Sequence, residues 1–262
     1  MSKTLGIAFG GSGAQAIAGV AYIKALENLE IKPDVVSGTG IGAVVAAMYA
    51  AGMGSEDMID FLREIVFPGS KRPINAAKVK DLKGGILDGL GLEEYYKMAV
   101  PIKVFDRLYF PLKIVAANTA TGEEVLFTQG DVGPAVRSAS AVPGIFSPHE
   151  VAGEFYMDGS CVNPVPFDVI RDECDVLAAI DPDITDEAQA DSAQVFSVLM
   201  NAFRICRKAL SFEKQRGCTV DLYEHIVLEG FTIFDFAHFE AIIESAEEQA
   251  GVFALGLQDL LK

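Results

Sequence analysis

The chain has 262 residues, half of them hydrophobic, and this size suits one large α/β domain with a substantial core. Its 37 acidic residues outnumber 21 basic ones, and the net charge of −16 repels nucleic acid phosphates and the anionic cytoplasmic face of a membrane. We therefore expect a single domain, residues 1–262, that binds no nucleic acid and makes at most peripheral membrane contact.

The first elements along the chain form two strand, loop and helix units. An apolar run, Leu5 to Phe9, ends in a glycine-rich loop and continues into Gln15 to Leu29, where apolar residues recur at helical spacing. A second strand, Asp34 to Ser37, is followed by a helix after Gly42. Two such units predict parallel strands joined by right-handed crossovers.

Two stretches without charge, Thr4 to Ile23 and Val35 to Ser55, are long enough to raise the question of membrane spans. Each contains several glycines, which lower the helix propensity and the packed apolar surface of a lipid-facing helix. We expect both stretches to be core elements instead. The first leads into a polar helix face without a cleavage-like site, so no signal peptide is predicted.

Later segments mix helices and strands. Residues 53–100 show no clear strand but contain two apolar helix stripes, at 58–66 and 92–99, of which we expect the first to pack in the core rather than form a lid. Two β-rich runs from Leu112 predict a hairpin or tight strand turn, and a helix, a proline-punctuated loop and a strand ending at Asp158 follow. "VLAAIDPDI" is another buried strand, and the remainder is expected to be mainly helical.

Cysteine and histidine usage indicates no metal site. The four cysteines form no C-x-x-C pair, and no histidine lies at zinc-finger spacing, so neither a zinc site nor a dense disulfide framework is predicted. Scattered core thiols in a reducing compartment account for them. We expect no metal, no cofactor and a cytoplasmic location.

The stretch "VVSGTGIGAVVAAMYAAG", residues 35–52, has the form of a nucleophile elbow. In the elbow G-x-S-x-G, a serine sits on a sharp turn between strand and helix with its hydroxyl exposed. Here the middle position is Gly40, which has no side chain with which to attack a substrate.

The same glycines also fit the dinucleotide fingerprint G-x-G-x-x-[GA], in "GGSGAQA" and again in "GTGIGA". That fingerprint places an acidic residue at the end of the following strand. Asp34 is the nearest candidate after the first motif, but it precedes the second strand, and Glu56 and Asp57 follow a helix with no strand between. A nucleotide-binding α/β protein is therefore an alternative that the pattern disfavours.

Four motifs follow one another along the chain: "GGSGAQA", "GTGIG", "SASAVPGIFSP" and "YMDGSCVNPVP". Each alone is a weak signal, but from about Leu5 to about Ala250 their order and spacing resemble the patatin-like phospholipases, in particular the compact bacterial members. The resemblance implies a three-layer patatin-like α/β fold, with a central, mostly parallel sheet flanked by helices. It also implies a lipid acyl hydrolase of phospholipase or lysophospholipase type, with a Ser-Asp dyad and no histidine.

The resemblance also implies the roles of individual residues. The serine of the family attacks an ester carbonyl, and the aspartate of its D-G-[GA] loop acts as base. By position Asp158 is this base, and Gly40 holds the nucleophile position. The glycine-rich loop stabilises the oxyanion through its backbone N–H groups, close to a favourable helix N-terminus. The residues expected to line this loop are Gly11, Ser12, Gly13 and Ala14.

Several positions depart from the family pattern. Where the family mostly has G-G-G-x-[RK]-G, this chain has Ser12, Gln15 and Ala16 in place of a glycine, a basic residue and another glycine, and Ser160 ends the D-G-[GA] motif. Losing the nucleophile of a serine hydrolase lowers kcat by about 10⁶. We therefore expect a chain that is inactive as it stands and binds a lipid or fatty acyl ester.

Gly40 is also compatible with two forms of an active enzyme. An active lipid acyl hydrolase could be represented here by a Ser-to-Gly variant, although the coincident changes in the glycine-rich loop favour natural divergence. Ser37, Thr39 or Ser12 could replace the nucleophile, but the elbow directs a single side chain into the pocket and its neighbours point elsewhere.

Overall fold

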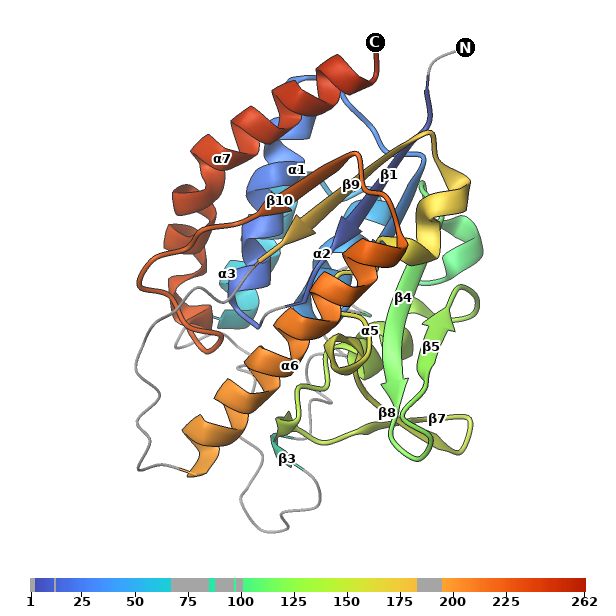
Figure 1. The fold of residues 1–262 in the computed structure, drawn as a ribbon, viewed down its shortest axis with the longest axis vertical. Coiled ribbons are helices and arrows are strands. Elements are labelled where there is room, and N and C mark those ends of the chain that lie inside the picture. The colour runs from blue at the N-terminus through green and yellow to red at the C-terminus, as the bar shows by residue number, and fades with distance from the viewer. Residues whose placement is uncertain (1–2, 12, 67–84, 88–96, 98–100, 183–194) are drawn as a thin grey trace.

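A central sheet lies between two helical layers, as the α/β prediction requires (Figure 1). The fold is known from a computed structural model, which describes residues 3–11, 13–66, 85–87, 97, 101–182 and 195–262. All statements below concern these residues.

The main sheet has the strand order β10-β9-β1-β2-β4-β8-β7, and β5 pairs with β4. The parallel strands are β1 (Leu5–Phe9), β2 (Val35–Gly38), β4 (Leu112–Asn118), β9 (Val176–Asp181) and β10 (Leu222–His225). The antiparallel strands are β5 (Glu124–Phe127), β7 (His149–Val151) and β8 (Glu154–Asp158). A separate parallel pair consists of β3 (Gly85–Leu87) and β6 (Gly144–Phe146).

The central strands are apolar along their whole length because both faces of the sheet are covered. All residues of β1, β2 and β9 are buried, as is typical of parallel strands between helices. In the register of these strands, Phe9 lies opposite both Gly38 and Ile180. The carboxyl ends of β1, β2 and β9 therefore meet at one edge of the sheet. The two strand-to-helix glycine turns predicted from the sequence lie at this edge.

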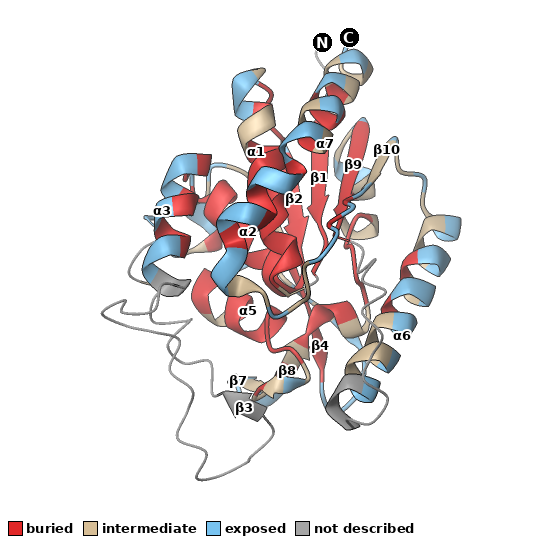
Figure 2. Ribbon diagram, turned by 90° about the vertical axis from the view of Figure 1, so that its left-hand side faces the viewer, coloured by how far each residue is buried: buried red, intermediate tan, exposed pale blue. Residues whose placement is uncertain are grey.

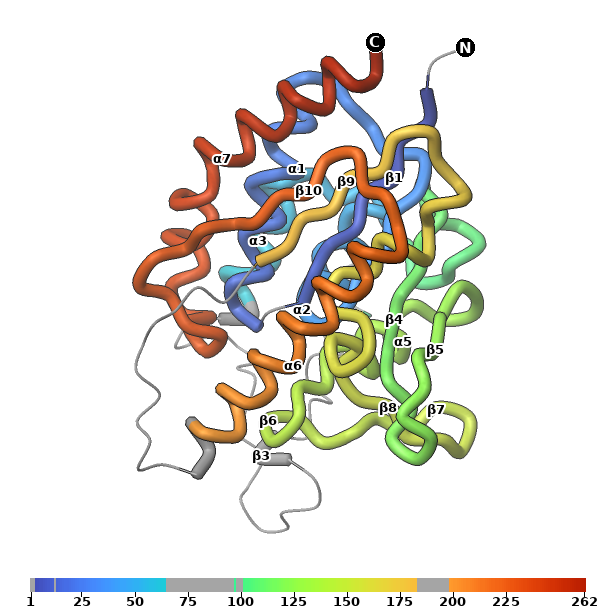
Figure 3. Tube along the Cα trace, viewed as in Figure 1, coloured from blue at the N-terminus to red at the C-terminus, as the bar shows by residue number. Residues whose placement is uncertain are grey.

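One layer of helices covers the face of the sheet that carries Leu5, Ile7 and Phe9. Its members are α1 (Gly19–Asn28), α2 (Gly40–Ala50), α3 (Ser55–Val66), α5 (Val132–Ala139) and α7 (Phe239–Leu260). Every residue of α2 is buried, which explains why it has no polar face. Figure 3 shows α7 beside α1. Near the end of α7, the Leu260 carbonyl accepts a hydrogen bond from the Lys3 ammonium at 2.5 Å.

The opposite face carries a smaller apolar cluster, in which Phe167 and Ile170 pack on Ala8 and Ala179. Helix α6 (Val195–Gly217) lies on this side, away from the first helical layer (Figures 1 and 2). Short 3₁₀ turns complete the described chain: η1 (Gln15–Ala18), η2 (Phe105–Arg107), η3 (Gly159–Cys161), η4 (Asp168–Glu173) and η5 (Phe236–His238).

Most of the predicted elements are confirmed, with differences at their ends. The helix expected over residues 15–29 begins as the 3₁₀ turn η1, and the helix expected after Gly42 begins at Gly40. The stripe at 58–66 lies in α3, and its Met58, Phe61 and Leu62 are buried in the core, as expected. The stripe at 92–99 falls almost wholly outside the described residues.

Strand β10 was not predicted, because the C-terminal part was expected to be mainly helical. It is an edge strand of partly exposed residues, held to β9 by backbone pairing from Leu222 to His225. The hairpin predicted from Leu112 onward is confirmed as the antiparallel pair β4 and β5.

In the part of the chain that the structure describes, no helix is both long and apolar enough to cross a membrane. All four cysteines are free. Cys206 is exposed on α6, so the expectation of a core thiol is wrong at this position, and the other three are only partly buried.

Candidate active site

The elbow is formed where β2 ends and α2 begins. Gly38 is the last residue of β2, Thr39 has an extended backbone and Gly40 starts α2 with a φ of +55°. A positive φ favours glycine, and other residues adopt it at a cost. The turn between β2 and α2 therefore has the sharp strand-to-helix geometry expected from the sequence, with glycine at the position of positive φ.

Asp158 approaches the elbow from β8, which is separated from β2 by β4 in the sheet. It ends β8, lies opposite Ala116 of β4 and is 3% exposed. The next residue must be glycine, because a Cβ at Gly159 would overlap the carbonyl oxygen of Val115. This close approach explains the D-G pair of the motif.

The elbow and Asp158 face each other directly. An ideal Cβ built on Gly40 would lie 3.3 Å from Oδ1 and 3.3 Å from Oδ2 of Asp158. Any side chain at position 40 would therefore touch the carboxylate. The structure brings together the two residues that the sequence singled out as nucleophile position and base.

Burial governs the protonation of Asp158. Loss of solvent raises its pKa above the ordinary value, while hydrogen bonds from Ser160 and the charge of Arg207 oppose this rise. The Ser160 backbone N–H donates to Oδ1 at 2.8 Å. A carboxyl with a raised pKa is suited to accept a proton near neutral pH.

The glycine-rich loop lies tightly against the elbow. The Cα of Gly11 would be 2.9 Å from a Cβ at position 40, so a side chain there would require the loop to shift. The N–H groups of Gly11 and Ala14, both predicted to line the oxyanion loop, donate to the carbonyls of Pro164 and Ile233 at 3.1 and 3.0 Å. Ser12 lies outside the described residues.

A segment near the C-terminus covers this loop. The fully buried Gln15, which stands where the family has a basic residue, donates through Nε2 to the Phe231 carbonyl at 2.7 Å. Gly13 lies against Ile233, since a Cβ there would overlap that residue's carbonyl oxygen. Gln15, one of the changed loop residues, therefore makes a specific contact within this protein.

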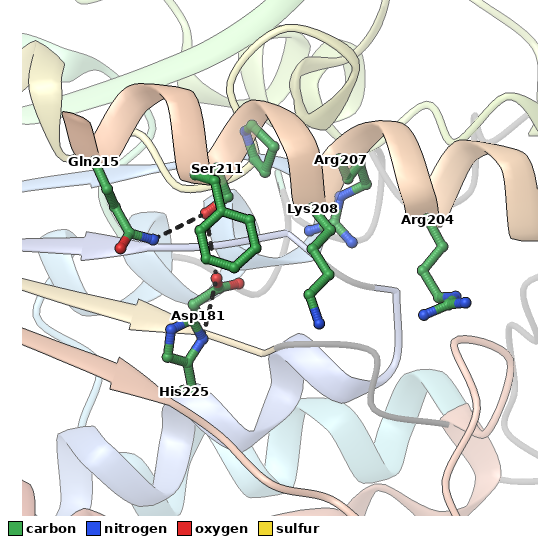
Figure 4. A pocket seen from close by; sticks show the side chains of 9 residues that line it. Asp181, Arg204, Arg207, Lys208, Ser211, Gln215 and His225 are labelled. Atoms are coloured by element: carbon green, nitrogen blue, oxygen red, sulfur yellow. Dashed lines mark hydrogen bonds and ion pairs between the residues drawn. The ribbon is translucent and has the colours of Figure 1, made fainter. Parts of the chain in front are cut away.

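Arg207 of α6 is a site residue that the sequence did not reveal. Its buried guanidinium donates to the Gly11 carbonyl, and its charge opposes the rise that burial causes in the pKa of Asp158. Figure 4 shows Arg207 with Arg204 and Lys208 in the hollow between α6 and Asp181 and His225, at the ends of β9 and β10. No local pattern could have linked α6 to a loop at the other end of the chain.

Three nucleophiles near the elbow, Ser37, Thr39 and Cys161, are engaged elsewhere or poorly ionised. The Ser37 hydroxyl donates to the Pro166 carbonyl at 2.7 Å, and the Thr39 hydroxyl donates to the Val115 carbonyl at 3.2 Å. Burial raises the pKa of Cys161 to about 12, which keeps the thiol protonated at neutral pH. These contacts explain why neither hydroxyl occupies the position that a residue 40 side chain would take.

The structure also shows where the residues considered for nucleotide binding and for metal binding lie. Asp34, the candidate ribose ligand, accepts the backbone N–H of Leu5 at 2.7 Å, at the amino end of the strands and away from the glycine turns. Among the described residues no group of three histidine, cysteine or acidic side chains could hold a metal ion.

The structure combines a mostly parallel sheet with a strand-to-helix glycine turn that faces a buried aspartate, within an α/β fold. Residues 7–171 match the family model described as patatin-like phospholipase, and the chain therefore belongs to this family. The resemblance inferred from the four motifs is thus confirmed.

Individual relatives are distant. An uncharacterized NTE family protein of Mycobacterium tuberculosis is 26% identical over 165 residues, which make up 63% of this chain and 45% of that protein. A lysophospholipase of Saccharomyces cerevisiae is 21% identical over 285 residues, and the match covers 98% of this chain and 17% of the length of that lysophospholipase. The chain thus spans less than half the length of these curated relatives.

Two solved structures are similar over most of the chain. VipD from Legionella pneumophila has a TM-score of 0.49 at 15% identity, covering 97% of this chain and 66% of VipD. The type III effector protein ExoU has a TM-score of 0.45 at 14% identity, with coverages of 97% and 53%.

Proposed function

We propose that this chain is a patatin-like lipid acyl hydrolase in which Gly40 has replaced the nucleophilic serine, so that it binds a lipid or fatty acyl ester without hydrolysing it. The observation that carries the proposal is the distance of 3.3 Å from an ideal Cβ at Gly40 to both carboxylate oxygens of Asp158. Both residues occupy positions of the family motifs, and a serine at position 40 is the single change needed to complete a dyad.

The chemistry follows from that geometry. A serine hydroxyl at position 40 would attack the ester carbonyl while Asp158 accepts its proton, and the same proton would then go to the leaving alcohol. The resulting acyl-enzyme would be hydrolysed by water that Asp158 deprotonates. N–H groups of residues 11–14 would stabilise the oxyanion, which requires Gly11 and Ala14 to exchange their present carbonyl partners for substrate.

With glycine at position 40, only the hydroxyl oxygen that would attack the ester is missing from these steps. The purified chain should hydrolyse p-nitrophenyl acyl esters no faster than its Asp158→Ala variant, because neither has a nucleophile for the carboxylate to activate. A hydrolysis rate that depends on Asp158 would overturn the inactive assignment and favour carboxylate-activated water.

The decisive test restores the serine. Gly40→Ser should form one adduct with a fluorophosphonate probe, seen by intact-mass spectrometry, while the parent and Gly40→Ala form none. Adding Asp158→Asn should abolish the adduct. A folded Gly40→Ser protein that stays unlabelled would contradict the proposed dyad.

Lipid binding is tested separately on the parent chain. A lysophospholipid or fatty acid that binds only the folded state should raise its Tm in a concentration-dependent way. No change in Tm with saturating ligands of several chain lengths would refute the lipid-binding part of the proposal. Sequencing codon 40 of the gene separates natural replacement from the alternative, an active hydrolase represented by a Ser-to-Gly variant.

A further inference from the structure

Helix α6 carries an exposed apolar stripe, and Phe212 at one end of this stripe also lines the hollow beneath the helix. Val198, Ile205 and Phe212 are 48%, 55% and 52% exposed, and they stand seven residues apart. Seven residues are close to two helical turns, so these side chains lie on one line along the helix. Ala202 and Ala209, exposed between them, continue the stripe.

The opposite side of α6 is attached to the protein. Arg207 and Ser211 are buried there, and Lys214 pairs with Glu124 and Asp168 at 3.0 and 2.5 Å. The helix is therefore held in a fixed orientation that keeps the stripe outward. Contiguous exposed apolar surface of this kind marks interaction sites on globular proteins.

The charge of α6 is opposite to that of the rest of the chain. The helix holds five of the 21 basic residues and, in Glu213, one of the 37 acidic residues. Arg204 and Lys208 line the hollow beneath α6 together with Phe212, and both side chains project to the side of Asp181 and His225 (Figure 4). Long basic side chains beside an apolar stripe can extend to the headgroups while the stripe enters the acyl region.

We propose that this face of α6 docks on a membrane surface that contains anionic phospholipid, an inference that takes its lipid substrate from the proposed function above. Charge complementarity selects this partner over a second copy of the chain, because two α6 stripes packed together would bring like charges close. The overall charge of −16 repels an anionic surface, but α6 itself carries more basic than acidic residues. Arg207, on the inner side of the same helix, holds Gly11, so α6 connects the docked face to the glycine-rich loop.

The chain contains no tryptophan, so a single introduced tryptophan reports its own environment. Phe212→Trp should show a blue-shifted emission with vesicles of phosphatidylcholine and phosphatidylglycerol at 7:3, and a smaller shift with phosphatidylcholine alone. Val252→Trp is the matched control, because Val252 is 68% exposed on α7, whose charged residues are all acidic. Equal shifts at both positions, or none at Phe212→Trp, would overturn the proposal.

Co-sedimentation with the same vesicles measures the contribution of each part of the surface. Ile205→Asp should lower the partition constant for vesicle binding about tenfold, as expected for losing one buried aliphatic side chain. Leu255→Asp, at a 55% exposed position of α7, should leave it unchanged. Lys208→Glu should weaken binding to anionic vesicles but not to phosphatidylcholine, and Lys262→Glu should do neither.

Two further measurements distinguish membrane docking from self-association and from the hydrolase assignment. If light scattering shows a dimer that Ile205→Asp converts to a monomer, the stripe is a self-association surface and the membrane proposal fails. In the Gly40→Ser background, Ile205→Asp should leave labelling by a water-soluble fluorophosphonate intact. Vesicle binding without such labelling would refute the hydrolase assignment alone, and labelling without vesicle binding would refute the docking surface alone.

Discussion

At the residue scale, Gly40 is favoured by two independent constraints. Its φ of +55° lies in the left-handed region, and a Cβ would come within 2.9 Å of the Gly11 backbone. An enzyme of this fold that has serine here would have to offset both the cost of the positive φ and the cost of the close contact in order to keep its nucleophile. This chain, by contrast, has the residue that suits the backbone best.

Gly40→Ser should therefore lower the free energy of unfolding, by about 1 to 3 kcal/mol for the backbone conformation, plus the cost of moving the Gly11 loop. Gly122→Ser is the control for the backbone cost alone, because Gly122 has a φ of +72° with nothing within 4 Å of its Cβ position. Urea titrations of both variants measure the difference. A Gly40→Ser protein as stable as the parent would show that the elbow is not strained.

Asp158 links burial to pH dependence. Its folded-state pKa is raised by loss of solvent, so the folded state disfavours the ionised carboxylate. The contribution of this group to stability is thus full below its unfolded pKa of about 4 and is lost as pH rises through the folded pKa.

Asp158→Asn should accordingly be stabilising at high pH. The amide keeps the shape and an acceptor for the Ser160 N–H but cannot ionise. The difference in Tm between variant and parent should increase from about pH 5 towards about pH 9, above the ordinary carboxyl pKa. A difference that is constant over this range would mean that Asp158 carries no burial penalty.

At the scale of elements, α7 completes the helical layer although it lies beyond the segment matched by the family model. The Phe253 ring meets the Tyr22 ring edge-on with centroids 5.2 Å apart, and the Tyr22 hydroxyl donates to Glu224 at 3.1 Å. Three elements, α1, α7 and β10, are joined at this point.

Phe253→Ala should therefore destabilise the protein by about 3 to 5 kcal/mol, the usual range for removing a buried aromatic ring. Val252→Ala, one residue earlier on the exposed face, should change stability by no more than about 0.5 kcal/mol. Chemical denaturation followed by circular dichroism compares them. Equal effects would indicate that α7 packs only loosely on α1.

At the scale of the whole molecule, the sheet is assembled from both ends of the chain. β1 is paired on one side with β2 and on the other with β9, and β10 follows β9 at the edge. The segment matched by the family model, residues 7–171, ends before β9 begins at Val176. A polypeptide ending there would expose one side of the central strand.

The expectation of a single domain leads to a direct test. Residues 1–262 should unfold in one cooperative transition, with circular dichroism and tyrosine fluorescence giving coincident curves. A truncated chain of residues 1–172 should show no cooperative transition, because β1 would lose its partner β9. Cooperative unfolding of the truncated chain would show that the C-terminal part is a separate unit.

The sequence alone determined β1, β2, β4 and β9, the elbow at Gly40 and the loop of Asp158, because buried strands and tight turns leave local patterns of apolar residues and glycines. The family motifs then predicted that Gly40 and Asp158 meet. Only the tertiary structure decided the positions of β10, of Arg207 beside Gly11 and of Phe231 to Ile233 over the glycine-rich loop. These contacts use backbone hydrogen bonds and distant segments, and a backbone carbonyl selects no particular side chain for its partner, so they leave no local pattern in the sequence.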